Sequence, residues 1–177
     1  VGSTANNWID GLAGNDNLSG DAGNDHLDGG LGNDNLYGGL GNDTLIAGVG
    51  NDYTQGNEGN DYIRAGAGDD DLQGGDGNDI LYGEAGFDFA SYLAAPSAVV
   101  VDLAFGGPQN TSGAGYDSLF EIEGLRGSYS GDYFYGNAGV NHIYGFHGND
   151  YLDGRDGDDA LIGGEGNDCI LGGAGND

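Results

Sequence analysis

The feature that most constrains this chain is an aspartate that returns every nine residues. It closes a Gly-Asn-Asp triplet, or a close variant, and recurs nine times without a slip in the first half of the chain. After an interruption the same spacing returns, with asparagine once in the aspartate's place. The members are Asp16, Asp25, Asp34, Asp43, Asp52, Asp61, Asp70, Asp79 and Asp88, then Asp132, Asn141, Asp150, Asp159, Asp168 and Asp177. A fixed period of this kind indicates a repeat architecture.

The positions around this aspartate predict short strands and no helices. Two residues after most of the aspartates stands an aliphatic residue, as at Leu18, Leu45 and Ile63. Glycine fills 41 of the 177 positions, and each glycine in a helix interior costs about 1 kcal/mol. Strands of about three residues, separated by turns of about six that are rich in glycine, asparagine and aspartate, suit the period better. We therefore predict an all-β chain built as a solenoid.

The net charge excludes several classes of partner. Thirty acidic residues stand against three arginines and no lysine, and the formal charge is −27. Such a chain repels phosphate groups, so we expect no nucleic-acid partner, and it attracts cations. No apolar run approaches the roughly 18 residues of a membrane helix, so we expect no membrane insertion. Because the sequence begins with Val1 and stops within a repeat at Asp177, we expect it to be a fragment of a longer protein.

The spacing divides the chain into three zones. They are a first repeat block, an irregular connector and a second, truncated block, at residues 1–88, 89–126 and 127–177. In the connector we expect strands in residues 98–103 and 116–125, with a loop between them. Asp88 and Asp132 are 44 residues apart, one short of five repeats, so a loop or bulge in the connector must absorb the mismatch.

The repeats resemble those of a known family. Residues 38–46 read Gly-Gly-Leu-Gly-Asn-Asp-Thr-Leu-Ile, residues 74–82 read Gly-Gly-Asp-Gly-Asn-Asp-Ile-Leu-Tyr, and residues 163–171 read Gly-Gly-Glu-Gly-Asn-Asp-Cys-Ile-Leu. This pattern is similar to the RTX nonapeptide, the haemolysin-type calcium-binding repeat, over about four-fifths of the chain. The resemblance implies a right-handed parallel β-roll, a β-helix solenoid with Ca²⁺ between stacked turns.

Stacking explains why such a fold needs a cation. Two nine-residue units make one coil of 18 residues, and their aliphatic residues meet in a thin core between two sheets. Units one coil apart lie about 4.8 Å from each other, so the aspartates form two columns in each block. Neighbouring carboxylates at about 5 Å repel by roughly 3 kcal/mol at an effective dielectric of about 20, and a divalent cation between turns reverses the sign. In the connector, Asp117 and Glu123 either extend the columns or lie at solvated strand edges.

Calcium suits these turns best. It takes six to eight oxygen ligands in irregular geometry, whereas Mg²⁺ demands a tight octahedron and zinc prefers nitrogen or sulfur. The resemblance implies that each ion takes carboxylates of two turns and carbonyls at the glycine two before the aspartate and further upstream. Counting the gaps between stacked turns gives about 8 to 11 ions, enough to neutralise most of the charge. The candidate ligands are the fourteen aspartates named above and Gly14, Gly23, Gly30, Gly32, Gly39, Gly41, Gly48, Gly50, Gly59, Gly66, Gly68, Gly75, Gly77, Gly148, Gly157, Gly164, Gly166, Gly173 and Gly175.

The resemblance also implies a function: a calcium-binding structural module of a secreted bacterial protein. We expect the metal-free chain to be largely disordered, to leave the cell through type I secretion machinery, and to fold outside on binding Ca²⁺. There it would stabilise its parent protein or a surface assembly. Two alternatives stay open. The chain could be an accessory C-terminal module of a secreted metalloprotease, lipase or polysaccharide epimerase, or a segment of an adhesin or surface layer with a polysaccharide or cell-surface partner.

The remaining polar residues suggest no catalytic site. His142 and His147 are five residues apart and match no metalloprotease motif, His26 stands alone, and Cys169 follows an aspartate on a short expected strand. We interpret all four as bystanders and the chain as non-catalytic. The eleven tyrosines are interpreted as covering strand surfaces, with a glycan-binding face as the alternative.

Overall fold

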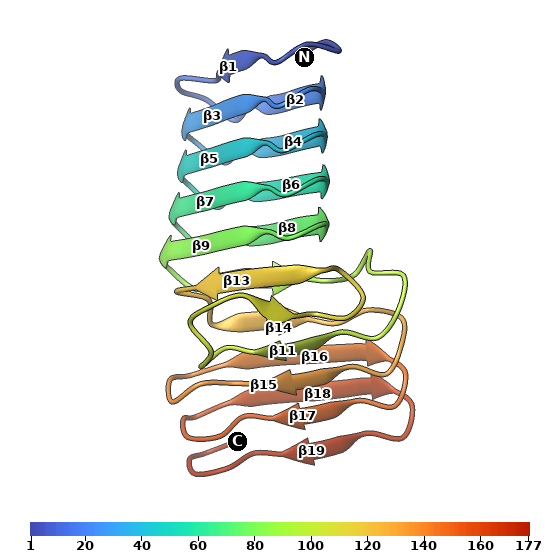
Figure 1. Ribbon diagram of the computed structural model, residues 1–177. Coiled ribbons are helices and arrows are strands. Elements are labelled where there is room, and N and C mark those ends of the chain that lie inside the picture. Colours follow the sequence, from blue (N-terminus) through green and yellow to red (C-terminus); the bar gives the residue numbers. More distant parts are fainter.

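The computed structural model describes residues 1–177 and confirms the all-β prediction, because every element in it is a strand. The chain winds through stacked coils, and its two ends lie at opposite ends of the stack (Figure 1). No long apolar helix of the kind that crosses a membrane is present. The first strands are β1 (Trp8–Asp10), β2 (Asn17–Ala22), β3 (His26–Leu31), β4 (Asn35–Leu40), β5 (Thr44–Val49), β6 (Tyr53–Glu58), β7 (Tyr62–Ala67), β8 (Asp71–Asp76) and β9 (Ile80–Ala85). The later strands are β10 (Phe89–Ser91), β11 (Val100–Asp102), β12 (Gln109–Asn110), β13 (Tyr116–Phe120), β14 (Gly124–Arg126), β15 (Tyr133–Tyr135), β16 (His142–His147), β17 (Tyr151–Asp153), β18 (Ala160–Glu165) and β19 (Cys169–Leu171).

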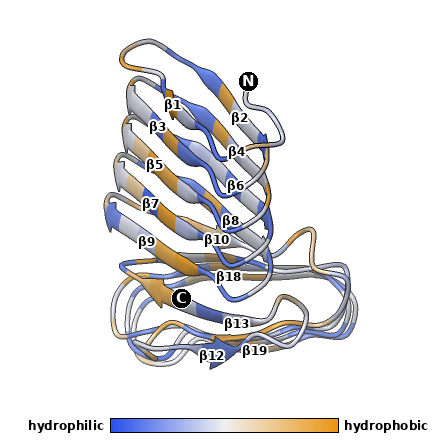
Figure 2. Ribbon diagram, turned by 45° about the horizontal axis from the view of Figure 1, so that its top comes forward, coloured by the Kyte–Doolittle hydropathy of each residue, from blue (hydrophilic) through white to orange (hydrophobic).

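Parallel pairing between successive coils sets the spacing of the solenoid. Leu27 faces Leu45, and Leu45 faces Ile63, each pair 18 residues apart as predicted. These side chains are fully buried between the two sheets, and hydrophobic stretches repeat from coil to coil (Figure 2). The core is therefore a narrow row of aliphatic side chains, and it leaves the turns on either side to supply much of the stability.

Most strands of the first block are longer than predicted. Strands β2 to β9 have six residues each, where about three were expected. The pairing skips one residue, as at Gly29, and resumes at Gly30, whose φ of 98° lies in the left-handed region. A Cβ at Gly30 would meet the carbonyl oxygen of Leu12 in the previous coil, so glycine lets the two backbones approach. The ladder thus continues into the turn.

The two blocks share one sheet and differ in the other. An eight-stranded sheet runs through both, in the order β18-β16-β14-β10-β8-β6-β4-β2. The opposite side divides into a seven-stranded sheet, β1-β3-β5-β7-β9-β13-β12, and a four-stranded sheet, β11-β15-β17-β19. Strand β12 is antiparallel to β13, and Ser112, just after β12, forms an antiparallel bridge with Val99, just before β11. The parallel stack is therefore interrupted on one side only.

The connector holds the strands expected in residues 98–103 and 116–125, since β11 lies in the first range and β13 in the second. The expected loop between them contains the short strand β12. On the shared sheet, Phe89 faces Gly124, one residue short of two full coils. This pairing accounts for the slip in spacing between the blocks.

One buried hydroxyl in the core predicts a stabilising substitution. Thr54 takes an aliphatic position between Leu36 and Leu72, is 1% exposed, and its Oγ1 has no hydrogen-bond partner. Thr54→Val keeps the shape and removes the unpaired hydroxyl, so the free energy of unfolding in calcium is expected to rise by about 1 kcal/mol. Denaturant unfolding measures this change, with Thr44→Val on β5, which faces outward, as a control near zero. A loss of stability in Thr54→Val would contradict the assignment.

Candidate metal centre

The aspartates form a ladder along each column. The Oδ1 atom of one aspartate accepts a hydrogen bond from the backbone N–H of the aspartate one coil earlier. Asp25 donates to Asp43 in this way and Asp43 to Asp61, both at 2.7 Å. The other column repeats the pattern, as between Asp34 and Asp52. The predicted columns are therefore present, and they stack like charges at successive coils.

The asparagines of the Gly-Asn-Asp triplets form a second ladder. The Asn42 N–H donates to Asn24 Oδ1 at 3.0 Å, and the Asn60 N–H donates to Asn42 Oδ1 at 2.7 Å. The asparagine side chain thus bonds to the coil after it, whereas the aspartate side chain bonds to the coil before it. Each triplet is tied to both neighbours. This role was not predicted from the sequence, although asparagine precedes the aspartate in most repeats and could have indicated it.

The second carboxylate oxygen of the column aspartates has no partner. Oδ2 is buried and accepts no hydrogen bond in eleven of them. A buried carboxylate oxygen without a donor or a cation is strongly disfavoured. The arrangement therefore fits a metal ion bound at this oxygen. The eleven residues are Asp16, Asp25, Asp34, Asp43, Asp52, Asp61, Asp70, Asp79, Asp88, Asp150 and Asp159.

A small residue five positions before each aspartate lets the backbone lie close to the free oxygen. The point where a Cβ of Gly29 would lie is 2.5 Å from both Asp34 Oδ2 and the Ala47 carbonyl oxygen of the next coil. A carboxylate and a main-chain oxygen face Gly38 in the same way. A carboxylate oxygen and a main-chain oxygen of neighbouring coils thus lie beside this glycine, and such oxygen atoms are the ligands that Ca²⁺ takes. This position was not recognised from the sequence, although only glycine or alanine stands there in the repeats.

The glycines implied as carbonyl ligands lie in the same turns, two or four residues before an aspartate. All of them have a positive φ except Gly175, near the C-terminal end. Gly41 has a φ of 128°, for example, and a Cβ there would meet the Gly23 carbonyl oxygen of the coil before. These glycines allow the close stacking of the turns. Their carbonyls as calcium ligands stay a prediction.

Side chains alone do not build a metal site in this chain. Nowhere do three or more histidine, cysteine, aspartate or glutamate side chains converge on one point. An ion held by the columns therefore needs further oxygen ligands besides the carboxylates, and main-chain carbonyls of the turns can supply them. Such a mixed oxygen site is ordinary for Ca²⁺ and foreign to Zn²⁺.

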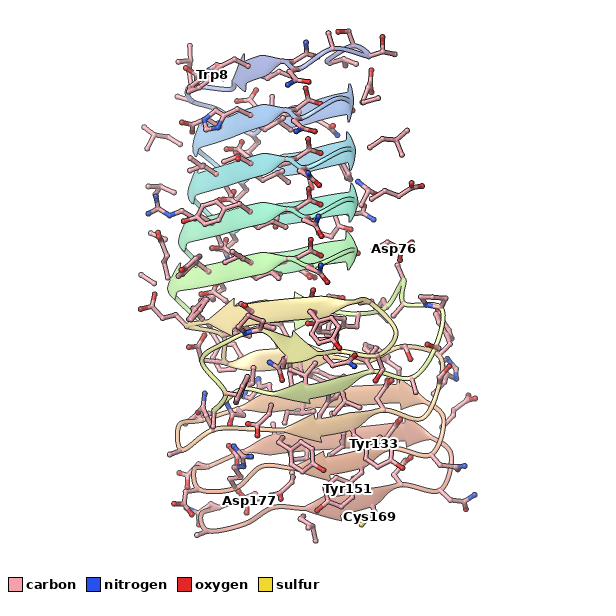
Figure 3. All side chains as sticks on the ribbon, viewed as in Figure 1. Trp8, Asp76, Tyr133, Tyr151, Cys169 and Asp177 are labelled. Carbon is pink, nitrogen blue, oxygen red and sulfur yellow. The ribbon has the colours of Figure 1, made fainter.

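The residues interpreted as bystanders lie on outer surfaces. His26 stacks on Trp8, with ring centroids 3.9 Å apart. Cys169 is exposed on the last strand (Figure 3). Tyr133 and Tyr151 stack on the outer side of neighbouring strands, with centroids 6.2 Å apart (Figure 3). These contacts fit the interpretation of the tyrosines as a cover for strand surfaces.

Burial raises the pKa of the column carboxyls. It brings the pKa of Asp61 and Asp70 to about 6, and that of Asp79 and Asp88 to about 7, from an ordinary value of 3.8. Loss of hydration is the largest cause; the backbone hydrogen bond lowers each pKa and the stacked carboxylate raises it. Without a metal these carboxyls hold protons more strongly than free ones, and a cation must compete with those protons.

Two opposite effects of pH are expected. Because the pKa of Asp79 and Asp88 rises from 3.8 to about 7 on folding, folding takes up protons. Their contribution to the metal-free fold is full below about pH 4 and is lost as the pH rises through about 7. With calcium present, protons compete with the ion, so the calcium midpoint of folding rises as the pH falls. Far-UV circular dichroism of resin-stripped protein at pH 5 and pH 8, with and without calcium, measures both. A metal-free β signal stronger at pH 8 would contradict the first effect.

Two connector residues whose role was left open complete the columns. The Asp79 N–H donates to Asp117 Oδ1 at 3.1 Å, and the Asp88 N–H donates to Glu123 Oε2 at 3.0 Å. The string Gly115–Leu119 follows the Gly-x-Asp-x-Leu pattern of the repeats, so the place of Asp117 was recognisable. Glu123 was harder to recognise because a glutamate stands in the aspartate's position.

The repeats match a known family. A family sequence model described as the RTX calcium-binding nonapeptide repeat (4 copies) matches residues 1–36, 19–54, 55–90, 126–161 and 148–177. These overlapping matches cover well over half of the chain and leave out residues 91–125. No curated protein matches the chain. The matched segments are those that carry the free Oδ2 atoms.

Proposed function

This chain belongs to the RTX calcium-binding nonapeptide-repeat family, and we propose that it is a calcium-operated folding switch of an exported protein. The family consists of calcium-binding β-roll modules of secreted proteins. Inside the cell, where calcium is submicromolar, the chain stays unfolded and can pass through a type I exporter. Outside, at millimolar calcium, it folds. The folded roll then stabilises its parent protein or a surface assembly.

The observation that carries this proposal is the set of eleven buried Oδ2 atoms without a partner. We place each calcium ion between turns one coil apart, bound by these oxygens and by main-chain carbonyls, with about 8 to 11 ions in all. The same columns that repel one another without metal are bridged with it. The ion is therefore proposed as a condition of folding.

The repeat itself is a structural unit, and the family match identifies no catalytic family. We place any catalytic activity of the parent protein outside these residues. A polysaccharide or a cell surface as partner stays a proposal for the parent as a whole.

A calcium titration of the metal-free chain, followed by far-UV circular dichroism, tests the switch. The folding midpoint is expected between roughly 1 µM and 1 mM at pH 7.5, because only then is the chain unfolded inside a cell and folded outside. Magnesium over the same range is the control and is expected to be ineffective. A nanomolar midpoint, or a chain that stays folded in EGTA, would refute the switch.

A further inference from the structure

In residues 92–135, called the junction here, which include most of the connector and the start of the second block, hydrogen-bond donors of the protein bind carboxylate oxygens that have no partner elsewhere. Asp117 is 1% exposed and stacks on Asp79 like a repeat aspartate. Its Oδ2, however, accepts hydrogen bonds from the Tyr92 hydroxyl and from Thr111 Oγ1, both 3.2 Å long. The Thr111 hydroxyl shares its one proton with the Gly115 carbonyl oxygen at 2.9 Å, so the Tyr92 hydroxyl is the main donor that satisfies this oxygen without a cation. Asp117 therefore does not fit a calcium ligand.

The first aspartate of the second block is satisfied in a similar way. Asp132 is fully buried, and its Oδ1 accepts from the Val99 N–H at 2.8 Å and from Ser128 Oγ at 2.9 Å. Its Oδ2 accepts from the Ser128 N–H at 2.7 Å. One unit later, the uncharged Asn141 accepts at Oδ1 from the Asn137 N–H at 2.8 Å. Both carboxylate oxygens of Asp132 thus have hydrogen-bond donors, unlike those of the eleven aspartates with a free Oδ2.

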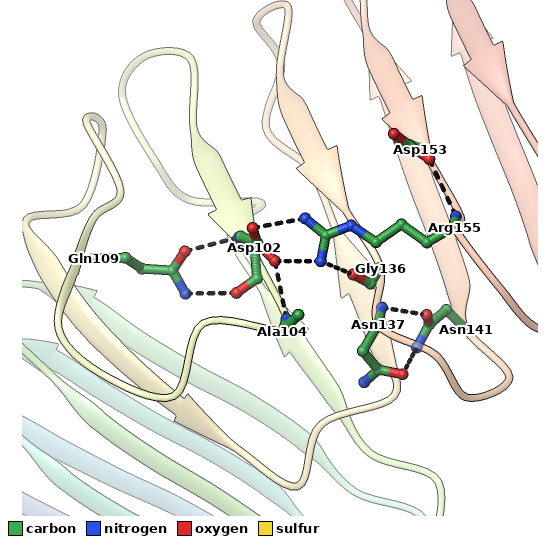
Figure 4. A network of polar contacts seen from close by, with 8 residues as sticks. All are labelled: Asp102, Ala104, Gln109, Gly136, Asn137, Asn141, Asp153 and Arg155. Carbon is green, nitrogen blue, oxygen red and sulfur yellow. Dashed lines mark hydrogen bonds and ion pairs between the residues drawn. The ribbon is translucent and has the colours of Figure 1, made fainter. Parts of the chain in front are cut away.

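Polar contacts fasten the junction to the second block without any metal (Figure 4). Arg155 forms a two-pronged ion pair with Asp102, at 2.8 and 2.7 Å, and donates to the Gly136 carbonyl oxygen. The Gln109 side chain accepts the Asp102 N–H at 2.7 Å and donates to the Asp102 carbonyl oxygen at 3.2 Å. Gln109 thus covers part of the β11 edge with a side chain in place of a strand.

The junction also has the bulkiest part of the core. Phe134 is the largest fully buried side chain of the molecule, and it lies opposite Val101 in the β11–β15 pair. Tyr92 and Leu125 belong to the same buried cluster. Since each Å² of buried apolar surface contributes roughly 25 cal/mol, bulkier side chains let this segment depend less on metal than the narrow rows of the blocks do.

We propose that the junction is a calcium-independent latch, in which hydrogen-bond donors of the protein replace the ion at Asp117 and Asp132. It binds no calcium at these two residues and keeps its structure at calcium concentrations at which both blocks have opened. The proposal rests on the calcium-dependent folding of the blocks proposed above. It places the start of folding in the middle of the chain, from which the blocks grow outward as they fill with calcium.

Hydrogen–deuterium exchange of the full chain, followed by mass spectrometry at falling calcium concentrations, tests the order of opening. Peptides that cover β11, β13 and β14 are expected to keep their protection to calcium concentrations at least about tenfold lower than peptides of β3 to β8, a difference of about 1.4 kcal/mol. Simultaneous loss of protection in junction and blocks would overturn the latch while leaving the folding switch intact. Protection of the blocks in EGTA would instead overturn the switch, and the latch with it.

The variant Tyr92→Phe tests the replacement of the ion by a hydroxyl. It keeps the ring and leaves Asp117 Oδ2 short of a donor, so protection of the junction is expected to be lost at a several-fold higher calcium concentration than in the parent chain, while the blocks keep their own midpoint. Thr111→Val removes the other donor and gives the same readout should Tyr92→Phe not fold. The matched control is Tyr37→Phe on β4, where the hydroxyl has no such partner. An unchanged calcium dependence of the junction in both donor variants would overturn the proposal.

Discussion

In EGTA at pH 8, the chain is expected to lose most of its far-UV β-sheet signal and to recover it when millimolar calcium is restored. Eleven aspartates have a buried carboxylate oxygen with no partner, and at pH 8 nearly all of these groups are ionised in water. Each stacked pair repels by roughly 3 kcal/mol at an effective dielectric of about 20. Whole domains are stable by only about 5 to 15 kcal/mol, so a few such pairs are enough to open the fold.

The rest of the fold cannot offset this repulsion. The core of the first block is a narrow row of side chains such as Leu36 and Leu72. It is thinner than the packed layers of a globular domain. The chain has no disulfide, since its one cysteine is free. Circular dichroism together with equilibrium dialysis measures folding and bound calcium on the same samples. A full β signal in EGTA at pH 8, with no calcium in the dialysed protein, would show that the fold does not need the ion.

The period of the aspartates predicted a repeat fold of short strands, the resemblance to the RTX repeat implied the parallel roll, and 18-residue coils then place the aspartates in columns. Residues that are one coil apart in the sequence lie next to each other when the coils stack. Leu27 and Leu45, which are 18 residues apart, pair in this way. The role of the residue five positions before the aspartate was not predicted. A glycine in a turn can be required either by a positive φ or by the close approach of another group, and the sequence does not distinguish the two. The place beside Asp34 shows that close approach is the reason at Gly29.

The connector was less predictable for a physical reason. Its pairing depends on residues far apart in sequence, such as Gln109 and Asp117 in the antiparallel β12–β13 pair, and no period relates them. Glu123 takes an aspartate's place at the point where the spacing is one residue short of two full coils, and it bonds to the Asp88 N–H. The donors that satisfy Asp117 come from Tyr92 and Thr111, which no repeat pattern marks.

The second large effect is expected from Asp61→Asn, which removes a single column charge. Asp61 is 2% exposed, its Oδ1 accepts from the Asp43 N–H, and its Oδ2 is free. Asparagine keeps the Oδ1 acceptor but puts an N–H₂ donor where the ion would bind. The calcium midpoint of folding is therefore expected to rise at least about tenfold, or about 1.4 kcal/mol. At the natural Asn141 an asparagine side chain is held in this position by other bonds: its Oδ1 accepts from the Asn137 N–H at 2.8 Å, and its Nδ2 donates to the Glu123 carbonyl oxygen at 3.2 Å.

The sign of the change without metal separates this mechanism from simple damage to the fold. Removing one buried charge relieves repulsion, so Asp61→Asn should need more calcium to fold and yet be less unstable than the parent chain in EGTA. Asp28→Asn on β3 makes the same charge change outside the columns. It should leave both the calcium midpoint of folding and the stability in EGTA nearly unchanged. Calcium titrations and metal-free urea titrations of the two variants measure both. If Asp61→Asn weakened the fold equally with and without calcium, its carboxylate would be a turn former and not a calcium ligand.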